Sequence, residues 1–199
     1  MKFACIDMEG VLIPEIWPFL AQKTGLPTLS RTTREEPDYN KLVINRIETL
    51  NNNNLKLSDI VREISKLTIL PGALEFITQL RKSHRVILVS DVFQQMAMPF
   101  LSAPRDPELR CHYFKCDVNG FISSAEYSRQ HGKIDVINEI RESRPNSKIL
   151  AVGDAYNDIE MINNADKGFL FRPSTETVES AGNIKIVQSY TEILESINN

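Results

Sequence analysis

The 199-residue chain lacks the features that mark several large classes of protein. No apolar run approaches the ~18 residues that a membrane span requires. The 23 basic and 26 acidic side chains leave a formal net charge of −3, so there is no overall attraction to nucleic acid or to an anionic membrane. No Gly-x-x-x-x-Gly-Lys-[Ser/Thr] motif occurs, which argues against a P-loop kinase. Any anionic substrate must therefore be bound by local groups.

Cysteine is also scarce. The three cysteines, Cys5, Cys111 and Cys116, match no zinc or redox spacing. Cys5 lies in a predicted buried strand, where it serves as a small core residue. No apolar segment typical of a signal peptide precedes that strand. We therefore expect a cytoplasmic protein with reduced thiols.

What is present is an alternation of strands and helices. Short apolar runs predict strands at 3–6, 85–89, 149–152, 168–171 and 184–187, and Asn119-Gly120 predicts a type I′ hairpin turn within 111–127. Helical patterns occupy 14–24, 38–50, 58–66, 72–80, 92–101, 133–144, 156–163 and 190–197, with a loop at 102–110. This order predicts an α/β fold with a doubly wound parallel sheet. The helical stretch 14–70 is expected as a small cap inserted after strand 1 of a core formed by 1–13 and 71–199.

The first strand ends at a pair of acidic residues. Asp7 and Glu9 follow the run 3–6 and precede Gly10. Ligands of open α/β sheets bind at the carboxyl ends of the strands, and a glycine there lets the backbone approach closely. In this position Asp7 suits a nucleophile, and Glu9, one methylene longer, suits a general acid/base.

A second acidic pair follows a later strand. Asp154 and Asp158 are four residues apart, a spacing at which like charges repel by roughly 0.2–0.5 kcal/mol on a helix. A divalent cation would turn that repulsion into attraction. The alternative is that Asp154 caps the helix and Asp158 favours its positive end. Together with Asp7 at another strand end, the two aspartates predict a metal site.

Two polar positions could hold a phosphoryl group, and each has a plainer explanation. Ser90 ends a strand and could donate its hydroxyl, although Ser90 or Asp91 could equally cap the next helix. Lys133 stands at a helix start, where a cation opposes the macrodipole, so an anion there would explain it; the alternative is a solvated surface lysine.

The helical insertion offers two charged candidates. Arg46 lies on the apolar face of the helix 38–50, and its planar fork suits a carboxylate. Glu15 could hold a substrate amine. The alternatives are an internal ion pair of Arg46 with Glu48 or Glu15, and ordinary enrichment of Glu in a first helical turn.

Assembled, these residues describe phosphoryl transfer through an aspartyl-phosphate. Their order also resembles the four motifs of the haloacid dehalogenase superfamily: Asp7-x-Glu9-Gly10, Ser90, Lys133, and Gly153-Asp154-x-x-Asn157-Asp158. The insertion resembles a cap of the phosphoserine phosphatase type. The stretch from Asp7 to Trp17, the motif Pro37-Asp38-Tyr39 and Gly-Asp-x-Tyr-Asn-Asp are similar to the bifunctional phosphoserine phosphatase/homoserine phosphotransferase branch.

The resemblance implies roles for individual residues. It implies Mg²⁺ held by Asp7, the Glu9 backbone carbonyl and Asp154, with Asp158 in support. It implies that the substrate is a small phosphorylated amino acid. The remaining site positions, expected to bind or orient this substrate, are Glu15, Arg46, Ser90, Asp91, Lys133 and Asn157.

Two departures from the superfamily pattern leave alternatives open. The superfamily usually has Asp where Glu9 stands, although the bifunctional relatives share Glu. The segment 129–133 is shorter than in those relatives, so Arg129 could replace Lys133 as the phosphate-binding cation. Homoserine as an acceptor and the assembly state, monomer or homodimer, also stay open.

Other functions remain as alternatives. A phosphatase for another small monoester fits the same residues. A receiver-type signalling module uses similar groups, but its phospho-acceptor normally follows an inner strand and it lacks an insertion of this size. A non-catalytic binding protein is disfavoured because no motif is missing. No nucleic-acid or membrane partner is expected.

Overall fold

The computed structural model describes residues 1–101 and 107–198. Its elements follow the predicted alternation of strands and helices. In chain order they are β1 (Lys2–Ile6), α1 (Ile16–Thr24), η1 (Pro27–Ser30), α2 (Tyr39–Asn52), α3 (Leu57–Ile64), α4 (Ala73–Leu80), β2 (Arg85–Phe93), α5 (Gln94–Ala97), η2 (Met98–Phe100), β3 (Glu108–Cys116), β4 (Ile122–Glu126), α6 (Ile134–Ser143), β5 (Lys148–Gly153), η3 (Tyr156–Asp158), α7 (Ile159–Asn163), β6 (Lys167–Phe171), α8 (Thr175–Ser180), β7 (Lys185–Val187) and α9 (Tyr190–Asn198).

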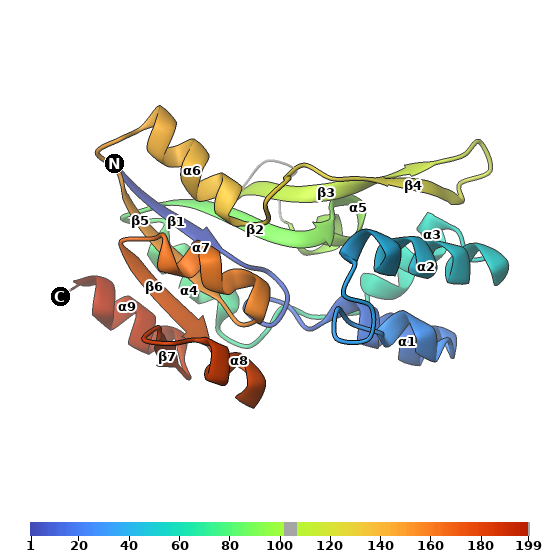
Figure 1. Ribbon diagram of the computed structural model, residues 1–199, viewed down its shortest axis with the longest axis horizontal. Coiled ribbons are helices and arrows are strands. Elements are labelled where there is room, and N and C mark those ends of the chain that lie inside the picture. Colours follow the sequence, from blue (N-terminus) through green and yellow to red (C-terminus); the bar gives the residue numbers. More distant parts are fainter. Residues whose placement is uncertain (102–106, 199) are drawn as a thin grey trace.

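In the described part of the chain, seven strands form one sheet in the order β4-β3-β2-β1-β5-β6-β7 (Figure 1). Neighbouring strands are parallel except β3 and β4, which form an antiparallel hairpin. The predicted doubly wound α/β fold is confirmed. Strand β1 lies between β2 and β5, so the residues that follow these three strands meet at one edge of the sheet.

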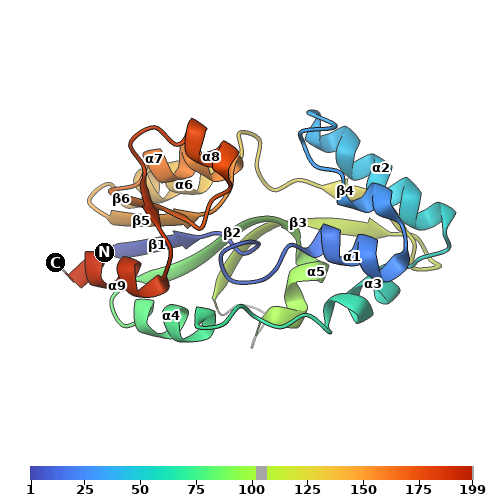
Figure 2. The same cartoon turned by 90° about the horizontal axis from the view of Figure 1, so that it is seen from below.

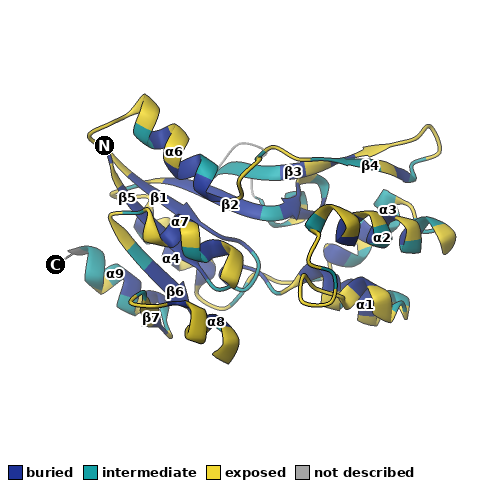
Figure 3. Cartoon of the chain, viewed as in Figure 1, coloured by how far each residue is buried: buried dark blue, intermediate teal, exposed yellow. Residues whose placement is uncertain are grey.

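Helices cover both faces of this sheet (Figure 2). Phe3 and Cys5 of β1 pack in a buried cluster with residues of α6 and α7, whereas Ala4 and Ile6 belong to the cluster that includes α4 and α9. The central strands are buried, and the exposed residues lie on the outer sides of the helices (Figure 3). Burial on both faces explains why the strand sequences are apolar without alternation.

Helices α1, α2 and α3 gather beyond the carboxyl ends of the central strands (Figures 1 and 2). The β3–β4 hairpin runs alongside them: Asn51 donates to the Ile122 carbonyl at 2.9 Å. The two segments that join these helices to the sheet lie side by side, because the Leu70 N–H donates to the Leu12 carbonyl at 2.9 Å. None of the described helices is both long and apolar enough to cross a bilayer.

Strand β2 is longer than the sequence predicted. It was expected to end at Val89, but it continues to Phe93 through a register shift against β3. Phe93 stacks on Phe114 with ring centroids 3.6 Å apart, and this non-local contact favours strand over helix. The predicted helix 92–101 is therefore reduced to the short α5 and η2, and Pro99 lies within η2.

Two local predictions also differ. The hairpin turn is not type I′, since only Gly120, and not Asn119, has a positive φ, and Asp117 Oδ1 accepts from the N–H groups of Asn119 and Phe121. Helix α8 was missed, although Ser174 caps it by accepting from the Thr177 N–H. The predicted loop 102–110 lies partly outside the described residues, and from Glu108 onward the chain is strand.

Candidate active site

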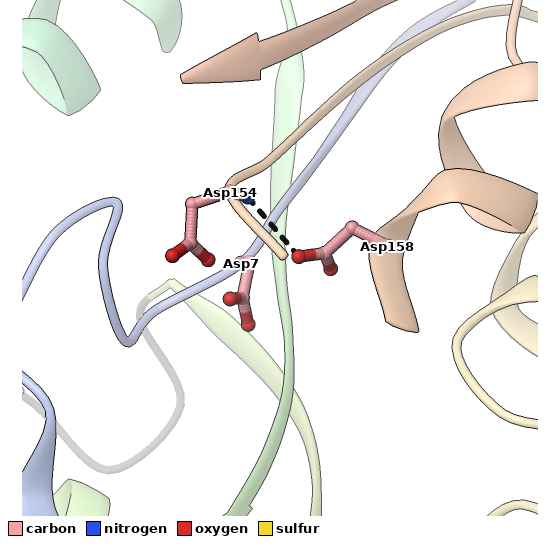
Figure 4. Close-up of side chains that lie close together, drawn as sticks. All are labelled: Asp7, Asp154 and Asp158. Atoms are coloured by element: carbon pink, nitrogen blue, oxygen red, sulfur yellow. Dashed lines mark hydrogen bonds between the residues drawn. The ribbon is translucent and has the colours of Figure 1, made fainter. Parts of the chain in front are cut away.

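Three carboxylates meet at the carboxyl ends of β1 and β5 (Figure 4). Asp7 directly follows β1, Asp154 directly follows β5, and Asp158 ends η3. One oxygen from each lies within 4.8 Å of the others. The sheet order thus brings together residues that are almost 150 positions apart in sequence.

The loop after β5 is shaped around Asp158. Its Oδ2 accepts from the N–H groups of Asp154 and Ala155, both at 3.1 Å (Figure 4). A Cβ on Gly153 would come within 2.2 Å of Asp158 Cγ, so this position needs glycine. Asp158 therefore binds backbone N–H groups at a helix start, which agrees with the alternative that it favours the positive end of the helix. Asp154 does not cap η3, whose N-cap is Ala155.

Gly10 allows the loop after β1 to approach the second carboxylate. Its φ is +72°, and a Cβ there would lie 2.1 Å from Asp154 Oδ2. Backbone and carboxylate are therefore in direct contact, as expected from the glycine after Asp7 and Glu9.

Lys133 is the cation of this cluster. Its Nζ lies 2.8 Å from Asp7 Oδ1 and 2.7 Å from Asp158 Oδ1, and its side chain is 2% exposed. Although burial opposes the charged form, Asp158, Asp7 and Asp91 raise the pKa of Lys133 well above its ordinary value. The alternative of a solvated surface lysine is wrong.

One lysine does not balance three carboxylates. Burial and the charges of Asp158 and Glu15 raise the pKa of Asp154 to about 7. Burial also raises the pKa of Asp7, against the opposing charge of Lys133. Carboxylate oxygens are the preferred ligands of Mg²⁺, so an oxygen-lined cluster with excess negative charge fits this ion. Both oxygens of Asp158 already accept hydrogen bonds, which leaves Asp7 and Asp154 as the better ligands.

Glu9 faces the start of the helical insertion. Its Oε1 accepts from the N–H of Ile16, the first residue of α1, at 2.7 Å. Burial and the nearby charge of Glu15 raise the pKa of Glu9 to about 8, although the Ile16 hydrogen bond and Arg46 oppose the rise. A carboxyl that keeps its proton near neutral pH suits a general acid.

Ser90 and Asp91 lie within β2, at its register shift, and not at its end. Ser90 is buried, and Asp91 accepts a hydrogen bond from Asn157 Nδ2 at 2.7 Å. The capping alternative is wrong for both residues, since the N-cap of α5 is Phe93 and no side chain caps it.

Of the two candidate cations, Lys133 and Arg129, it is Lys133 that lies in the aspartate cluster. Lys133 contacts Asp7, whereas Arg129 donates to Asp91 Oδ1 at 2.6 Å and to the Ser90 carbonyl at 2.8 Å. Which of them binds phosphate stays a prediction. Tyr39, which the sequence placed in a resemblance motif without a site role, also reaches this region, because its hydroxyl donates to the Asp91 carbonyl at 2.9 Å.

Arg46 is buried between the inserted helices. Its guanidinium lies over the ring of Trp17, 4.4 Å from the centroid, and Nη2 donates to the Arg31 carbonyl at 2.7 Å. Its Nε is buried and, among the described residues, has no hydrogen-bond partner. No ion pair joins Arg46 to Glu15 or Glu48 in the described part of the chain, so the predicted alternative of an internal ion pair is wrong.

Comparison with known proteins agrees with this site. Residues 1–166 match the family model of haloacid dehalogenase-like hydrolases. The chain is 35% identical over 193 residues to a phosphoserine phosphatase of Pseudomonas syringae pv. tomato, covering 97% of this chain and 81% of that protein. It is 33% identical over 193 residues to phosphoserine phosphatase ThrH of Pseudomonas aeruginosa, covering 97% and 93%.

Solved structures share the fold. A phospho-aspartyl intermediate analogue of phosphoserine phosphatase superposes with a TM-score of 0.79 at 18% identity, covering 98% of each chain. The phosphoserine phosphatase of T. onnurineus gives a TM-score of 0.74 at 23% identity, covering 100% of this chain and 94% of that one. The chain belongs to the haloacid dehalogenase-like hydrolase family and is an enzyme of this class.

Proposed function

We propose that this enzyme is a Mg²⁺-dependent phosphoserine phosphatase that works through an aspartyl-phosphate on Asp7. The observation that carries the proposal is the buried Lys133, which lies between Asp7 and Asp158, two members of the carboxylate cluster that Asp154 completes. The two relatives above are named phosphoserine phosphatases, and this supports the substrate.

The proposed reaction has two steps. A carboxylate oxygen of Asp7 attacks phosphorus, the bond from phosphorus to the serine oxygen breaks, and Glu9 gives its proton to that oxygen. Glu9, now a carboxylate, then takes a proton from water as the water oxygen attacks phosphorus, which releases phosphate and restores Asp7. Mg²⁺ held by Asp7 and Asp154 would neutralise charge on the phosphoryl oxygens. Lys133 would add a second positive charge at the same place.

The helices within 14–70 would act as a cap that recognises the amino acid. The proposed boundary is supported by the Leu70–Leu12 hydrogen bond, which places the two connecting segments together. Arg46 would bind the carboxylate of phosphoserine, using the donor atom that has no partner in the described residues. Glu15, which is exposed and whose charge acts on Arg46, would bind the amino group.

The acceptor could also be homoserine, which would take the phosphoryl group in place of water. The cytoplasmic location stays a prediction, and the assembly state stays open.

The test is phosphate release from L-phosphoserine with Mg²⁺, run with and without homoserine. We expect phosphate release. Formation of phosphohomoserine when homoserine is present would show that the enzyme is bifunctional. Asp7→Asn should abolish both, whereas Asp166→Asn, the same change at the amino end of β6, should not. Release by purified Asp7→Asn protein would refute the mechanism. Cleavage of an aryl phosphate without cleavage of phosphoserine would refute the substrate.

A further inference from the structure

The carboxylate of Asp91 is the meeting point of three side chains from different elements. Oδ1 accepts from Arg129 Nη2 at 2.6 Å and lies 3.6 Å from His112 Nε2, while Oδ2 accepts from Asn157 Nδ2 at 2.7 Å. The backbone carbonyl of Asp91 accepts from the Tyr39 hydroxyl. Both carboxylate oxygens are thus bound by the protein itself.

The charge of Asp91 is strongly held. Although burial opposes ionisation, the charges of Lys133 and Arg129 and the hydrogen bonds from His112 and Asn157 keep the pKa of Asp91 well below its ordinary value. An ionised carboxylate only accepts hydrogen bonds, so it orients each donor toward itself.

Arg129 connects the Asp91 carboxylate to the backbone of β2 and β3. Its side chain is 4% exposed, and Nη2 donates both to Asp91 Oδ1 and to the Ser90 carbonyl, while Nη1 donates to the Arg110 carbonyl at 2.8 Å. The planar guanidinium therefore clamps the register shift of β2 against β3.

The clamp has a consequence for the Ser90 hydroxyl. Ser90 Oγ accepts from the Val92 N–H at 3.3 Å, which leaves the hydroxyl proton available to donate. Asn157 is held in a similar way, because its amide nitrogen donates to Asp91, and among the described residues its side chain makes no other hydrogen bond. Both residues, like Lys133, are expected to bind the phosphoryl group or to orient its neighbours.

We propose that Asp91 is a positioning residue that aligns Asn157 directly, and Ser90 through Arg129, with the aspartate cluster. This inference rests on the proposed function. It replaces the sequence-based expectation that Asp91 binds substrate, since each of its carboxylate oxygens already accepts a hydrogen bond from a side chain of the protein.

The test is the kinetics of Asp91→Asn on two substrates, L-phosphoserine and p-nitrophenyl phosphate. Misplaced phosphoryl contacts affect both substrates alike, so kcat should fall by the same factor on each, about 10- to 100-fold, with KM changed much less. Inhibition by orthovanadate, which occupies the phosphoryl site without an amino acid, should weaken as well. Asp166→Asn is the matched control, because Asp166 also pairs with Lys and Arg side chains but lies at the amino end of β6.

Coupling to Asn157 is the sharper readout. Asn157 is exposed, so Asn157→Ala should fold, and adding Asp91→Asn to it should cost less than Asp91→Asn costs alone, with the part that acts through Arg129 remaining. Asp91→Glu keeps the charge opposite Arg129 while moving it, and it serves if Asp91→Asn does not fold. Asp91→Glu should lower kcat by a smaller factor, and by the same factor on both substrates.

Each other result has a distinct meaning. A loss of activity confined to phosphoserine would mean that Asp91 contacts the amino acid. Full activity of both Asp91 variants would mean that Asp91 positions neither Asn157 nor Ser90. Either result overturns the inference about Asp91 and leaves the proposed function standing. Wild-type protein that cleaves only the aryl phosphate refutes the phosphoserine substrate, yet the Asp91 comparison still stands on that ester. Wild-type protein that cleaves neither ester overturns both proposals.

Discussion

The Nζ atom of Lys133 lies 2.8 Å from Oδ1 of Asp7, and both side chains are almost completely buried. A buried ion pair of this kind is costly to break from one side, since the remaining charge has neither water nor a partner. The pair therefore links the stability of the enzyme to its chemistry.

Lys133→Met should abolish turnover of phosphoserine and destabilise the metal-free protein by about 3–5 kcal/mol, because Asp7 and Asp158 lose their counter-charge. Chemical denaturation with and without Mg²⁺ measures this, and Mg²⁺ should recover part of the loss. Lys148→Met is the control: its ion pair with Asp166 is largely exposed and should contribute less than about 1 kcal/mol. Equal losses in the two variants would contradict the prediction.

Gly10→Ala should weaken Mg²⁺ binding, because the new Cβ would displace Asp154 Oδ2. Gly25→Ala separates this contact from backbone strain. Its φ is +71°, close to that of Gly10, but a Cβ there meets nothing within 4 Å. Both variants should lose about 1–2 kcal/mol of stability from the left-handed backbone. Calorimetric Mg²⁺ titration should show weaker binding for Gly10→Ala alone, and an equal change in both would argue against the contact.

The metal-free enzyme should lose stability as the pH rises toward about 7. Because the pKa of Asp154 is raised to about 7, the folded state binds this proton more tightly than the unfolded state. Unfolding then releases protons between the ordinary carboxyl pKa and about 7, so stability falls across that window. Mg²⁺, which favours the ionised form, should reverse the trend. Thermal denaturation across this pH range measures both effects, and an unchanged slope in Asp154→Asn would contradict the assignment.

Arg46→Ala should reduce kcat/KM for phosphoserine about 10- to 100-fold, roughly the contribution of one charged hydrogen bond. An aryl phosphate, which has no carboxylate, should be affected much less. Arg62→Ala, a change at an exposed arginine of α3, should leave both activities unchanged. Parallel losses on the two substrates would remove Arg46 from the specificity site.

Local sequence was sufficient for most elements. The apolar runs without alternation predicted strands buried on both faces, and the two hydrophobic clusters of β1 confirm this. Gly25 directly follows the predicted helix 14–24 and caps it in the left-handed conformation. Where prediction was wrong, a distant contact decided the outcome: stacking of Phe93 on Phe114 extends β2 through residues that read as helix.

The candidate site divides in the same way. The sequence by itself determined which carboxylates follow strand ends, since strand ends, glycines and acidic spacing are all local features. It could not tell which of Lys133 and Arg129 contacts Asp7, or place Asp91. The side chains concerned follow β1, lie in β2, precede α6 or follow β5, and they are neighbours only after the sheet has ordered those elements. Burial, and with it the raised pKa values of Glu9 and Asp154, likewise arises from packing of the whole chain and was decided by the tertiary structure alone.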